Sequence, residues 1–262
     1  MNEAELVLTH VLNCDRLSLY LNKDREMDKD KSALVSSILK RRLTLEPLQY
    51  ILGCTEFMGL KFMVDKRALI PRPETEILVE EALKLSAKAG RSAGRQLEIL
   101  DIGTGSACIA VSLAKNTKDC KITAVDISPE ALELARQNAD LHQARIEFIQ
   151  SDLFASLSGR RFDLIISNPP YIPTLELKGL AGEISFEPVL ALDGGGDGLD
   201  YYRRMIDQAG GYLNKGGFLL MEIGFGQAGQ IENILKKSEK FEIIGIIKDY
   251  NNIERVMVLW IS

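Results

Sequence analysis

Residues 2 to about 45 place their hydrophobic side chains at helical spacing. One stripe runs through Ala4, Val7, Leu8, Val11 and Leu12, and a second runs through Leu34, Val35, Ile38, Leu39 and Leu43. The spacing predicts helices packed on one another, and we expect residues 1–48 to form a small helical domain. Short apolar and aromatic runs then flank Met58-Gly59, as in a β-hairpin. We expect this hairpin and a linker, residues 49–75, to join the helical domain to the rest of the chain.

From residue 97 onward, short apolar segments alternate with amphipathic ones. Five segments are predicted strands: LEILDI, KITAVD, RIEFI, FDLIIS and GFLLMEI. The helical stripes between them are typical of a parallel sheet covered on both faces. The last two apolar runs are joined by the short polar turn 249–252, which is too short for a parallel crossover, so the last strand must run antiparallel to its neighbour. We therefore expect residues 76–262 to form one α/β domain that differs from an all-parallel dinucleotide fold.

Composition narrows the class of protein. The 262 residues are 46% hydrophobic and 26% charged, as in a globular chain. No apolar run approaches the roughly 20 residues of a membrane span, and the acidic start MNEAELVLTHVLN lacks the features of a signal peptide, so we expect a cytoplasmic protein with no membrane partner. Four scattered cysteines and two histidines favour neither a metal site nor disulfides. A net charge of −5 argues mildly against general binding to nucleic acid.

A glycine-rich segment, DIGTGSAC, follows the first strand of this α/β domain. Gly103 and Gly105 permit a tight turn and a close approach of the backbone to a ligand at the strand end, where open α/β sheets bind ligands. A plain turn is the alternative. The dinucleotide pattern also requires a small sixth residue, and Cys108 in that place disfavours NAD and FAD.

Acidic residues end the next two strands. Asp126 lies 21 residues after Gly105, close to the roughly 20 residues expected for an acid that accepts hydrogen bonds from ribose hydroxyls. The alternative is that Asp126 only caps the helix that Ser128 opens. Asp152 and Leu153 follow the third strand, where the carboxylate could accept from an adenine amino group and the leucine could cover the ring. A polar turn is the alternative there.

The fourth strand ends in NPPY, residues 168–171. Asn168 carries an amide oxygen, and the Pro169 carbonyl is less readily taken by a strand ladder because Pro170 has no N–H. Two such acceptors can hold one NH₂ group, and Tyr171 adds a flat face against which a planar amide or base can stack. A rigid turn is the alternative, but a turn requires neither Asn nor Tyr. The segment predicts a site for a planar amino group beside an adenosine-like ligand.

This segment resembles the Asn/Asp-Pro-Pro-Tyr hallmark of the class I S-adenosylmethionine-dependent methyltransferases that modify planar NH₂ groups. The resemblance implies a Rossmann-like seven-stranded sheet and the cofactor S-adenosyl-L-methionine. It implies a cofactor site made of Gly103, Thr104, Gly105, Ser106, Ala107, Asp126, Asp152, Leu153 and Asn168. It implies substrate binding by Asn168, Pro169, Pro170 and Tyr171, of which Asn168, Pro169 and Tyr171 are the expected catalytic residues. Two positions depart from many relatives: Ala107 replaces a glycine, and Leu153 replaces an aromatic residue.

Adenine in nucleic acid and glutamine in protein both carry such a nitrogen, and NPPY does not choose between them. ALIPRPETEILVE, residues 68–80, resembles the linker signature of the HemK-type release factor glutamine N5-methyltransferases. PLQYILGCTEFMGLKFMV, FEPVLALDGGGDGLDYYRRMI and GGFLLMEIG resemble further segments of that family, so the resemblance spans nearly the whole chain.

The resemblance implies methylation of the glutamine in the Gly-Gly-Gln loop of peptide chain release factors. It also implies that the helical domain grips the substrate protein and that no nucleic acid is required. Adenine N6-methylation of DNA or RNA is one alternative, which the acidic net charge disfavours. Glutamine methylation of a ribosomal protein is another alternative. The related enzymes with that activity carry Pro-Arg-Ser-Pro at the linker, whereas this chain has Pro-Arg-Pro-Glu at residues 71–74, which disfavours that alternative.

The linker also carries structural predictions. Pro71 and Pro73 stiffen an extended approach to the next helix, and Glu74 or Thr75 is placed to cap that helix. The polar and basic segment 84–96 predicts a surface turn before the first strand of the sheet.

Further residues are expected at the border of the site by the same resemblance. They are Glu187, Pro188 and the glycine-rich segment DGGGDGLD before the helix at Leu199. A flexible loop with an aspartate helix cap is the alternative for these. Glu222, at the end of the fifth strand, is a further expected rim residue.

Overall fold

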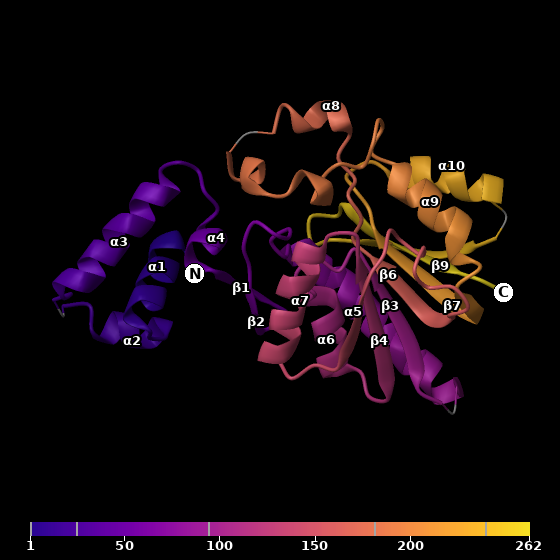
Figure 1. The fold of residues 1–262 in the computed structure, drawn as a ribbon, viewed down its shortest axis with the longest axis horizontal. Helices are drawn as coiled ribbons and strands as arrows, with labels where there is room; N and C mark the ends of the chain where they lie inside the picture. The colour runs from indigo at the N-terminus through magenta and orange to yellow at the C-terminus, as the bar shows by residue number, and fades with distance from the viewer. Residues whose placement is uncertain (1, 25, 94, 181, 239) are drawn as a thin grey trace.

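The computed structural model describes residues 2–24, 26–93, 95–180, 182–238 and 240–262. Its N-terminal lobe, indigo in Figure 1, contains the helices α1 (Glu3–Leu12), α2 (Arg16–Leu21), α3 (Lys29–Arg42) and α4 (Leu48–Leu52). An antiparallel hairpin of β1 (Cys54–Phe57) and β2 (Leu60–Met63) follows and leads into the larger lobe. None of the helices in the described ranges is both long and apolar enough to cross a membrane.

Side-chain caps and a small apolar core of their own explain why the first helices form. Asn2 and Glu5 make a capping box at α1, and Asp15 and Asp28 each accept a backbone N–H at the start of α2 and α3. The buried side chains of this lobe form a separate cluster, made of Val7, Val11, Ile38 and Leu48. The helices predicted from the hydrophobic spacing of residues 2 to about 45 are therefore present in the structure.

The larger lobe is built on one sheet of seven strands. In chain order the strands are β3 (Leu97–Ile102), β4 (Cys120–Asp126), β5 (Ile146–Gln150), β6 (Phe162–Ser167), β7 (Leu213–Glu222), β8 (Glu242–Lys248) and β9 (Glu254–Trp260). Their spatial order is β5-β4-β3-β6-β7-β9-β8. The first five in that order pair in parallel, whereas β9 is antiparallel to both β7 and β8. The predicted antiparallel ending and the seven-stranded fold are confirmed.

Helices cover both faces of this sheet (Figure 1). They are α5 (Pro73–Ala93), α6 (Cys108–Asn116), α7 (Pro129–Leu141), α9 (Asp200–Ala209) and α10 (Ala228–Ser238). The short helix α8 (Thr174–Leu177) and the 3₁₀ turns at Gly182–Phe186 (η1) and Val189–Ala191 (η2) lie in the segment between β6 and α9, and α8 stands apart from the sheet. Neighbouring residues of one strand enter opposite cores: Ile99 packs in the cluster with α5 and α6, and Leu100 packs in the cluster with α9 and α10. Strands buried on both faces explain the nearly continuous apolar runs in the sequence.

One sequence prediction about this lobe is wrong. The segment 84–96 was expected to be a surface turn, but α5 continues to Ala93. The buried stripe of Leu78, Ala82 and Leu85 extends the helix along the sheet, so packing of the apolar face outweighs the polar composition of the segment. The same helix begins at Pro73, inside the segment expected to be a linker.

Asn138 connects the hairpin to the α/β lobe. This fully buried side chain accepts from the Met63 amide at 2.7 Å and donates to the Met63 carbonyl and the Ser106 carbonyl, each at 2.9 Å. It therefore joins β2, α7 and the loop between β3 and α6 through three hydrogen bonds.

Replacing Asn138 by alanine should lower the free energy of unfolding by about 3 kcal/mol, because it leaves the partly buried Met63 amide and two carbonyls without their partner. Asn116→Ala is the matched control, since Asn116 makes one partly buried hydrogen bond to Ser112, and its cost should stay below about 1 kcal/mol. Urea denaturation measures both. Equal losses for the two variants would contradict the role given to Asn138.

Candidate active site

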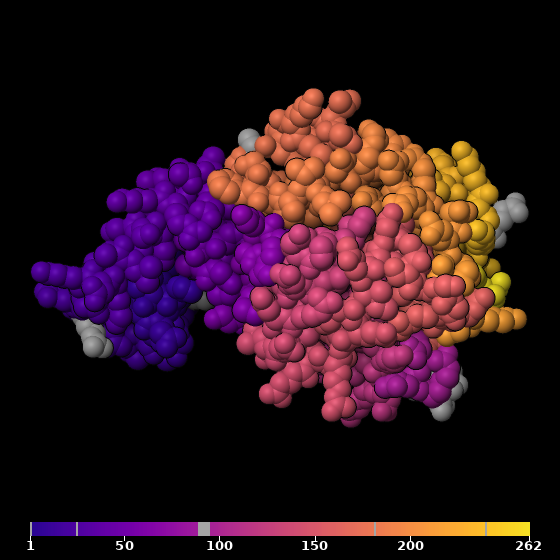
Figure 2. Space-filling model, viewed as in Figure 1, coloured from indigo at the N-terminus to yellow at the C-terminus, as the bar shows by residue number. Residues whose placement is uncertain are grey.

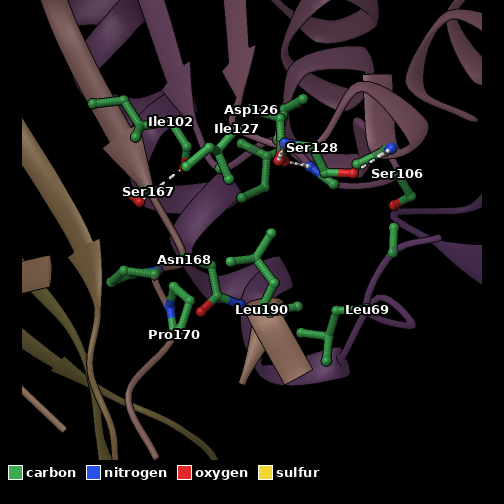
Figure 3. A pocket seen from close by; sticks show the side chains of 18 of the residues that line it. Leu69, Ile102, Ser106, Asp126, Ile127, Ser128, Ser167, Asn168, Pro170 and Leu190 are labelled. Carbon is green, nitrogen blue, oxygen red and sulfur yellow. Dashed lines mark hydrogen bonds between the residues drawn. The ribbon is translucent and has the colours of Figure 1, made fainter. Parts of the chain in front are cut away.

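A pocket opens at the carboxyl ends of the parallel strands, where open α/β sheets bind ligands. Its empty volume is about 1050 Å³, part of it open solvent. The loops after β3, β4, β5 and β6 line it, together with the segment 67–72 and η2. Figure 3 shows Ser106, Asp126 and Ser128 on one side and Asn168, Pro170 and Leu190 on the other.

The glycine loop has the backbone that its sequence predicts. Gly103 and Gly105 adopt φ values of 70° and 54°, in the left-handed region that favours glycine, and both line the pocket with Thr104 and Ser106. Ala107 does not line it. Ala107 is fully buried at φ 62° as the N-cap of α6, so the expected cofactor residue lies behind the loop.

Asp126 does not cap α7; its carboxylate instead holds the backbone of the loops after β3 and β4. Its Oδ2 accepts from the Gly105 amide at 2.9 Å, and its Oδ1 accepts from the Ser128 amide at 3.0 Å. Burial raises the pKa of Asp126, and these backbone hydrogen bonds oppose the rise. The hydroxyl of Ser128 caps α7 instead, accepting from the Ala131 amide. Because each carboxylate oxygen has two lone pairs, Asp126 holds the glycine loop and can still accept from a ligand.

Asp152 and Leu153 also line the pocket, after β5. Asp152 accepts a hydrogen bond from Arg204 at 2.7 Å, a partner that the sequence did not indicate. Ile127 lines the pocket beside Asp126, although 43% of its surface is exposed. An apolar residue directly after the acid at the end of β4 is a signal that the sequence analysis missed.

Asn168 is held by its amide nitrogen. Its Nδ2 donates to Thr75 Oγ1 at 3.1 Å, and no described residue donates to its Oδ1. Within the described ranges, the Pro169 carbonyl likewise accepts no hydrogen bond. Both residues line the pocket with Pro170, so two oxygens that accept no hydrogen bond from a described residue belong to the pocket wall.

Tyr171 does not line the pocket, contrary to the expectation for a stacking residue. The chain after Pro170 turns away to bridge residue 193, and Gly194 and Gly198 press so close to the Tyr171 backbone that a Cβ on either would lie within 3.0 Å of it. The Tyr171 ring packs against the cluster under α9 and α10, where burial, with a smaller contribution from Glu222, raises its pKa to about 12. Tyr201 of α9 lines the pocket instead.

Thr75 and Glu222 also differ from their expected places. Thr75 was expected as a possible helix cap and Glu222 as a rim residue. The structure buries both and joins them, with Thr75 Oγ1 donating to Glu222 Oε2 at 2.7 Å. Thr75 lines the pocket, whereas Glu222 lies behind it.

Glu187 is a buried anchor for the linker. Its carboxylate accepts from the Arg72 guanidinium and from the Ile70 amide. Burial raises the pKa of Glu187, and the charge of Arg72 opposes the rise. Arg72 and Pro188 line the pocket, so this ion pair fixes part of its wall.

Asp101 is a further buried acid beneath the glycine loop. Its Oδ2 accepts from the Thr104 hydroxyl at 2.6 Å, and its Oδ1 has no hydrogen-bond partner among the described residues. Burial raises the pKa of Asp101 to about 7, against the lowering effect of Thr104.

Asp101 should therefore make stability depend on pH. Its folded-state pKa lies above its unfolded value, so the folded state binds more protons and this stabilisation is lost as pH rises through about 7. The free energy of unfolding of the wild type, minus that of Asp101→Asn, should fall by on the order of 3 kcal/mol between about pH 4 and about pH 8. Urea titrations across that range measure it. A flat or rising difference would show that Asp101 is not a buried acid of this kind.

Comparisons with known proteins agree with this architecture. A Methyltransferase small domain model matches residues 75–197, and a PrmC N-terminal domain model matches residues 1–53. A methyltransferase from Pyrococcus furiosus superposes with a TM-score of 0.56, at 17% identity, covering 89% of this chain and 98% of that one. The catalytic domain of hMettl16 superposes with a TM-score of 0.61, at 17% identity, covering 90% and 93%. The fold and pocket define a class I S-adenosylmethionine-dependent methyltransferase.

Curated relatives narrow this class. The release factor glutamine methyltransferase of Geobacter sulfurreducens is 44% identical over 97% of this chain and 87% of its own length. That of Koribacter versatilis is 43% identical over 97% and 89%. The chain belongs to the release factor glutamine methyltransferase family. It is an enzyme that uses S-adenosyl-L-methionine to methylate glutamine in protein.

Proposed function

We propose that this enzyme methylates the N5 side-chain nitrogen of the glutamine in the Gly-Gly-Gln loop of peptide chain release factors. The observation that carries the proposal is the pair of pocket acceptors, Asn168 Oδ1 and the Pro169 carbonyl, to which no described residue donates. The primary amide of glutamine offers two N–H donors to such a pair. The release factor comes from the names of the curated relatives.

S-adenosylmethionine supplies the electrophilic methyl group, and the pocket residues fit it. We assign the glycine loop, Gly103 to Ser106, and the Asp126 carboxylate to the polar parts of the cofactor. The carboxylate suits a ribose diol because it only accepts hydrogen bonds. We assign Ile127 and Leu153 to the two faces of the adenine ring and Asp152 to its amino group.

The Asn168 and Pro169 oxygens then orient the substrate amide. An amide nitrogen is a poor nucleophile because its lone pair is conjugated with the carbonyl group. Accepting both N–H bonds fixes the nitrogen and favours the geometry in which its lone pair leaves the plane. The same two oxygens stabilise the positive charge that develops on the nitrogen. Asn168 is neutral and takes no proton, so we propose that the proton leaves to water.

Exposed apolar side chains beside the pocket provide a surface for a protein substrate. Val189 and Leu190 of η2 are 63% and 48% exposed, and Leu190 lines the pocket. Arg42 of α3 donates to Glu183 of η1 and so ties the N-terminal lobe to the segment that contains η1 and η2. Figure 2 shows the indigo to purple N-terminal lobe in contact with this orange segment. We propose that the helical domain, residues 1–48, contacts the release factor from this side and that the reaction takes place in the cytoplasm.

Incubation with a release factor and S-adenosylmethionine should add one methyl group to the loop glutamine, because that primary amide matches the two acceptors. Peptide mass spectrometry locates the added mass, and a release factor with the loop glutamine replaced by alanine is the control. Adenine-containing oligonucleotides and ribosomal proteins serve as competing substrates. Methylation of one of these while the release factor keeps its mass would overturn the substrate assignment.

Asn168→Ala should lower kcat by about 100-fold, because one of the two oriented oxygens is lost. Binding of S-adenosylmethionine, measured by calorimetry, should change little. Asn116→Ala is the control, since that asparagine lies at the end of α6, does not line the pocket and donates its side-chain amide to the Ser112 carbonyl. Full turnover by Asn168→Ala would exclude the role given to the Asn168 oxygen.

A further inference from the structure

A buried chain of hydrogen bonds leads from the pocket into the protein behind Asn168. Asn168 Nδ2 donates to Thr75 Oγ1 at 3.1 Å, and Thr75 Oγ1 lies 2.7 Å from Glu222 Oε2. Thr75 is 3% exposed and Glu222 is 2% exposed. The three residues come from the start of α5, the end of β7 and the turn after β6, and they lie 54 to 147 positions apart in the sequence.

The chemistry of these groups determines which of them donates and which accepts in each hydrogen bond. An ionised carboxylate only accepts, so Thr75 must use its single hydroxyl proton on Glu222. The Thr75 oxygen is then left as an acceptor, which only the NH₂ side of the Asn168 amide can satisfy. The two ends of a carboxamide are nearly equal in shape, so packing alone distinguishes them poorly, and this hydrogen-bond order decides which end faces Thr75.

We propose that Glu222 and Thr75 are positioning residues. They hold the Asn168 side-chain nitrogen by a hydrogen bond to Thr75, and this leaves the Asn168 oxygen turned toward the substrate amide. The inference rests on the proposed role of Asn168 and extends it to two residues that the sequence placed elsewhere. With the amide reversed, an NH₂ group would face the N–H donors of the substrate, and the pair of acceptors would be lost. The buried negative charge also polarises the chain, which makes the Asn168 oxygen depend on Glu222.

Groups from several elements face the Glu222 carboxyl. They are Glu74 of α5, Cys108 of α6, Tyr202 of α9, Arg255 of β9 and Tyr171 after β6. Burial raises the pKa of Glu222 to about 7; the Thr75 hydrogen bond, the charge of Arg255 and a hydrogen bond from Asn168 oppose the rise, and Glu74 adds to it. Tyr202 anchors the same residue by donating to its backbone carbonyl at 2.9 Å.

Protonation of Glu222 would allow the donor and acceptor roles in these hydrogen bonds to reverse. Protonated Glu222 can donate to Thr75, which frees the Thr75 hydroxyl to donate to the Asn168 oxygen and hold the amide the wrong way round. The proposal therefore requires kcat to rise with pH over the range in which Glu222 loses its proton. A threonine that only fastened α5 to the sheet would leave the pH profile of kcat unchanged.

Substitutions at position 75 test the hydroxyl. Thr75→Val keeps the shape and should lower kcat about 10-fold, with little change in KM or in cofactor affinity, because it removes orientation rather than binding. Thr75→Ser restores the hydroxyl and should recover most of the rate. The matched control is Thr123→Val, since Thr123 is also buried between a donor, Arg160, and a glutamate, Glu147, but lies outside the pocket. Equal losses for the valine variants at positions 75 and 123 would overturn the proposal.

Glu222→Gln tests the charge. A glutamine can accept or donate at this place, so the rise of kcat with pH should disappear in this variant. Asp101→Asn is the control, because Asp101 is another buried acid whose pKa is raised to about 7, and this variant should keep the rise. If kcat rises with pH equally in Glu222→Gln, or if this rise is lost in Asp101→Asn alone, the titrating group is not Glu222 and the proposal is overturned.

A measurement without substrate separates this inference from the proposed function. In ¹⁵N–¹H spectra, the side-chain NH₂ signals of Asn168 are assigned by their absence in Asn168→Ala. They should shift with pH around a midpoint near 7 in the wild type, and that shift should be absent in Glu222→Gln. If the signals shift as expected while no release factor is methylated, the proposed substrate fails and the positioning role stands. Signals that do not change between about pH 6 and about pH 8 would overturn the positioning role whatever the substrate.

Discussion

The parallel register of the central strands places the site. Ile102 pairs with Val125 on one side and with Ser167 on the other, and Ser167 pairs with Met221. The next residue of each strand therefore falls in one row across the sheet, which contains Gly103, Asp126, Asn168 and Glu222. Shifting one strand by a single residue would move its member of this row to the other face of the sheet. The hydrogen bonds of the ladder thus fix side chains that are far apart in the sequence at one edge.

Two acids of this row, together with Asp101 two residues before Gly103, are largely shielded from water, which is costly for stability. Asp101, Asp126 and Glu222 are withdrawn from water, and burial raises the pKa of each. The protein offsets the cost locally, with the Thr104 hydroxyl on Asp101, two backbone amides on Asp126 and the Thr75 hydroxyl on Glu222. Such groups are expected where a site must hold polar ligands in fixed directions rather than where a core only needs to pack.

The sequence predicted those features that depend on local patterns. Strand runs, the short turn before β9 and the glycine loop each carry their signal within about ten residues, and the residues after β4, β5 and β6 were placed at the pocket for the same reason. The misplaced residues depend on distant partners. Thr75 was expected to cap a helix because it follows two prolines at the start of a helical segment. Its hydroxyl instead donates to Glu222, which lies 147 positions away in the sequence. Tyr171 looked like a stacking face, but it is turned aside by glycines at positions 194 and 198.

Specificity for glutamine must come from outside the row. The same fold occurs in methyltransferases of low sequence identity, so the sheet and the cofactor pocket do not select a substrate. The two oxygen acceptors, in the role proposed for them, select a planar NH₂ group, which bases and amides share. What remains is the wall built by the linker and η2, where Arg72 is fixed to buried Glu187 and exposed Leu190 reaches the pocket. An apolar rim joined to the helical lobe suits an extended loop of a protein better than the phosphate backbone of a nucleic acid, which requires clustered positive charge.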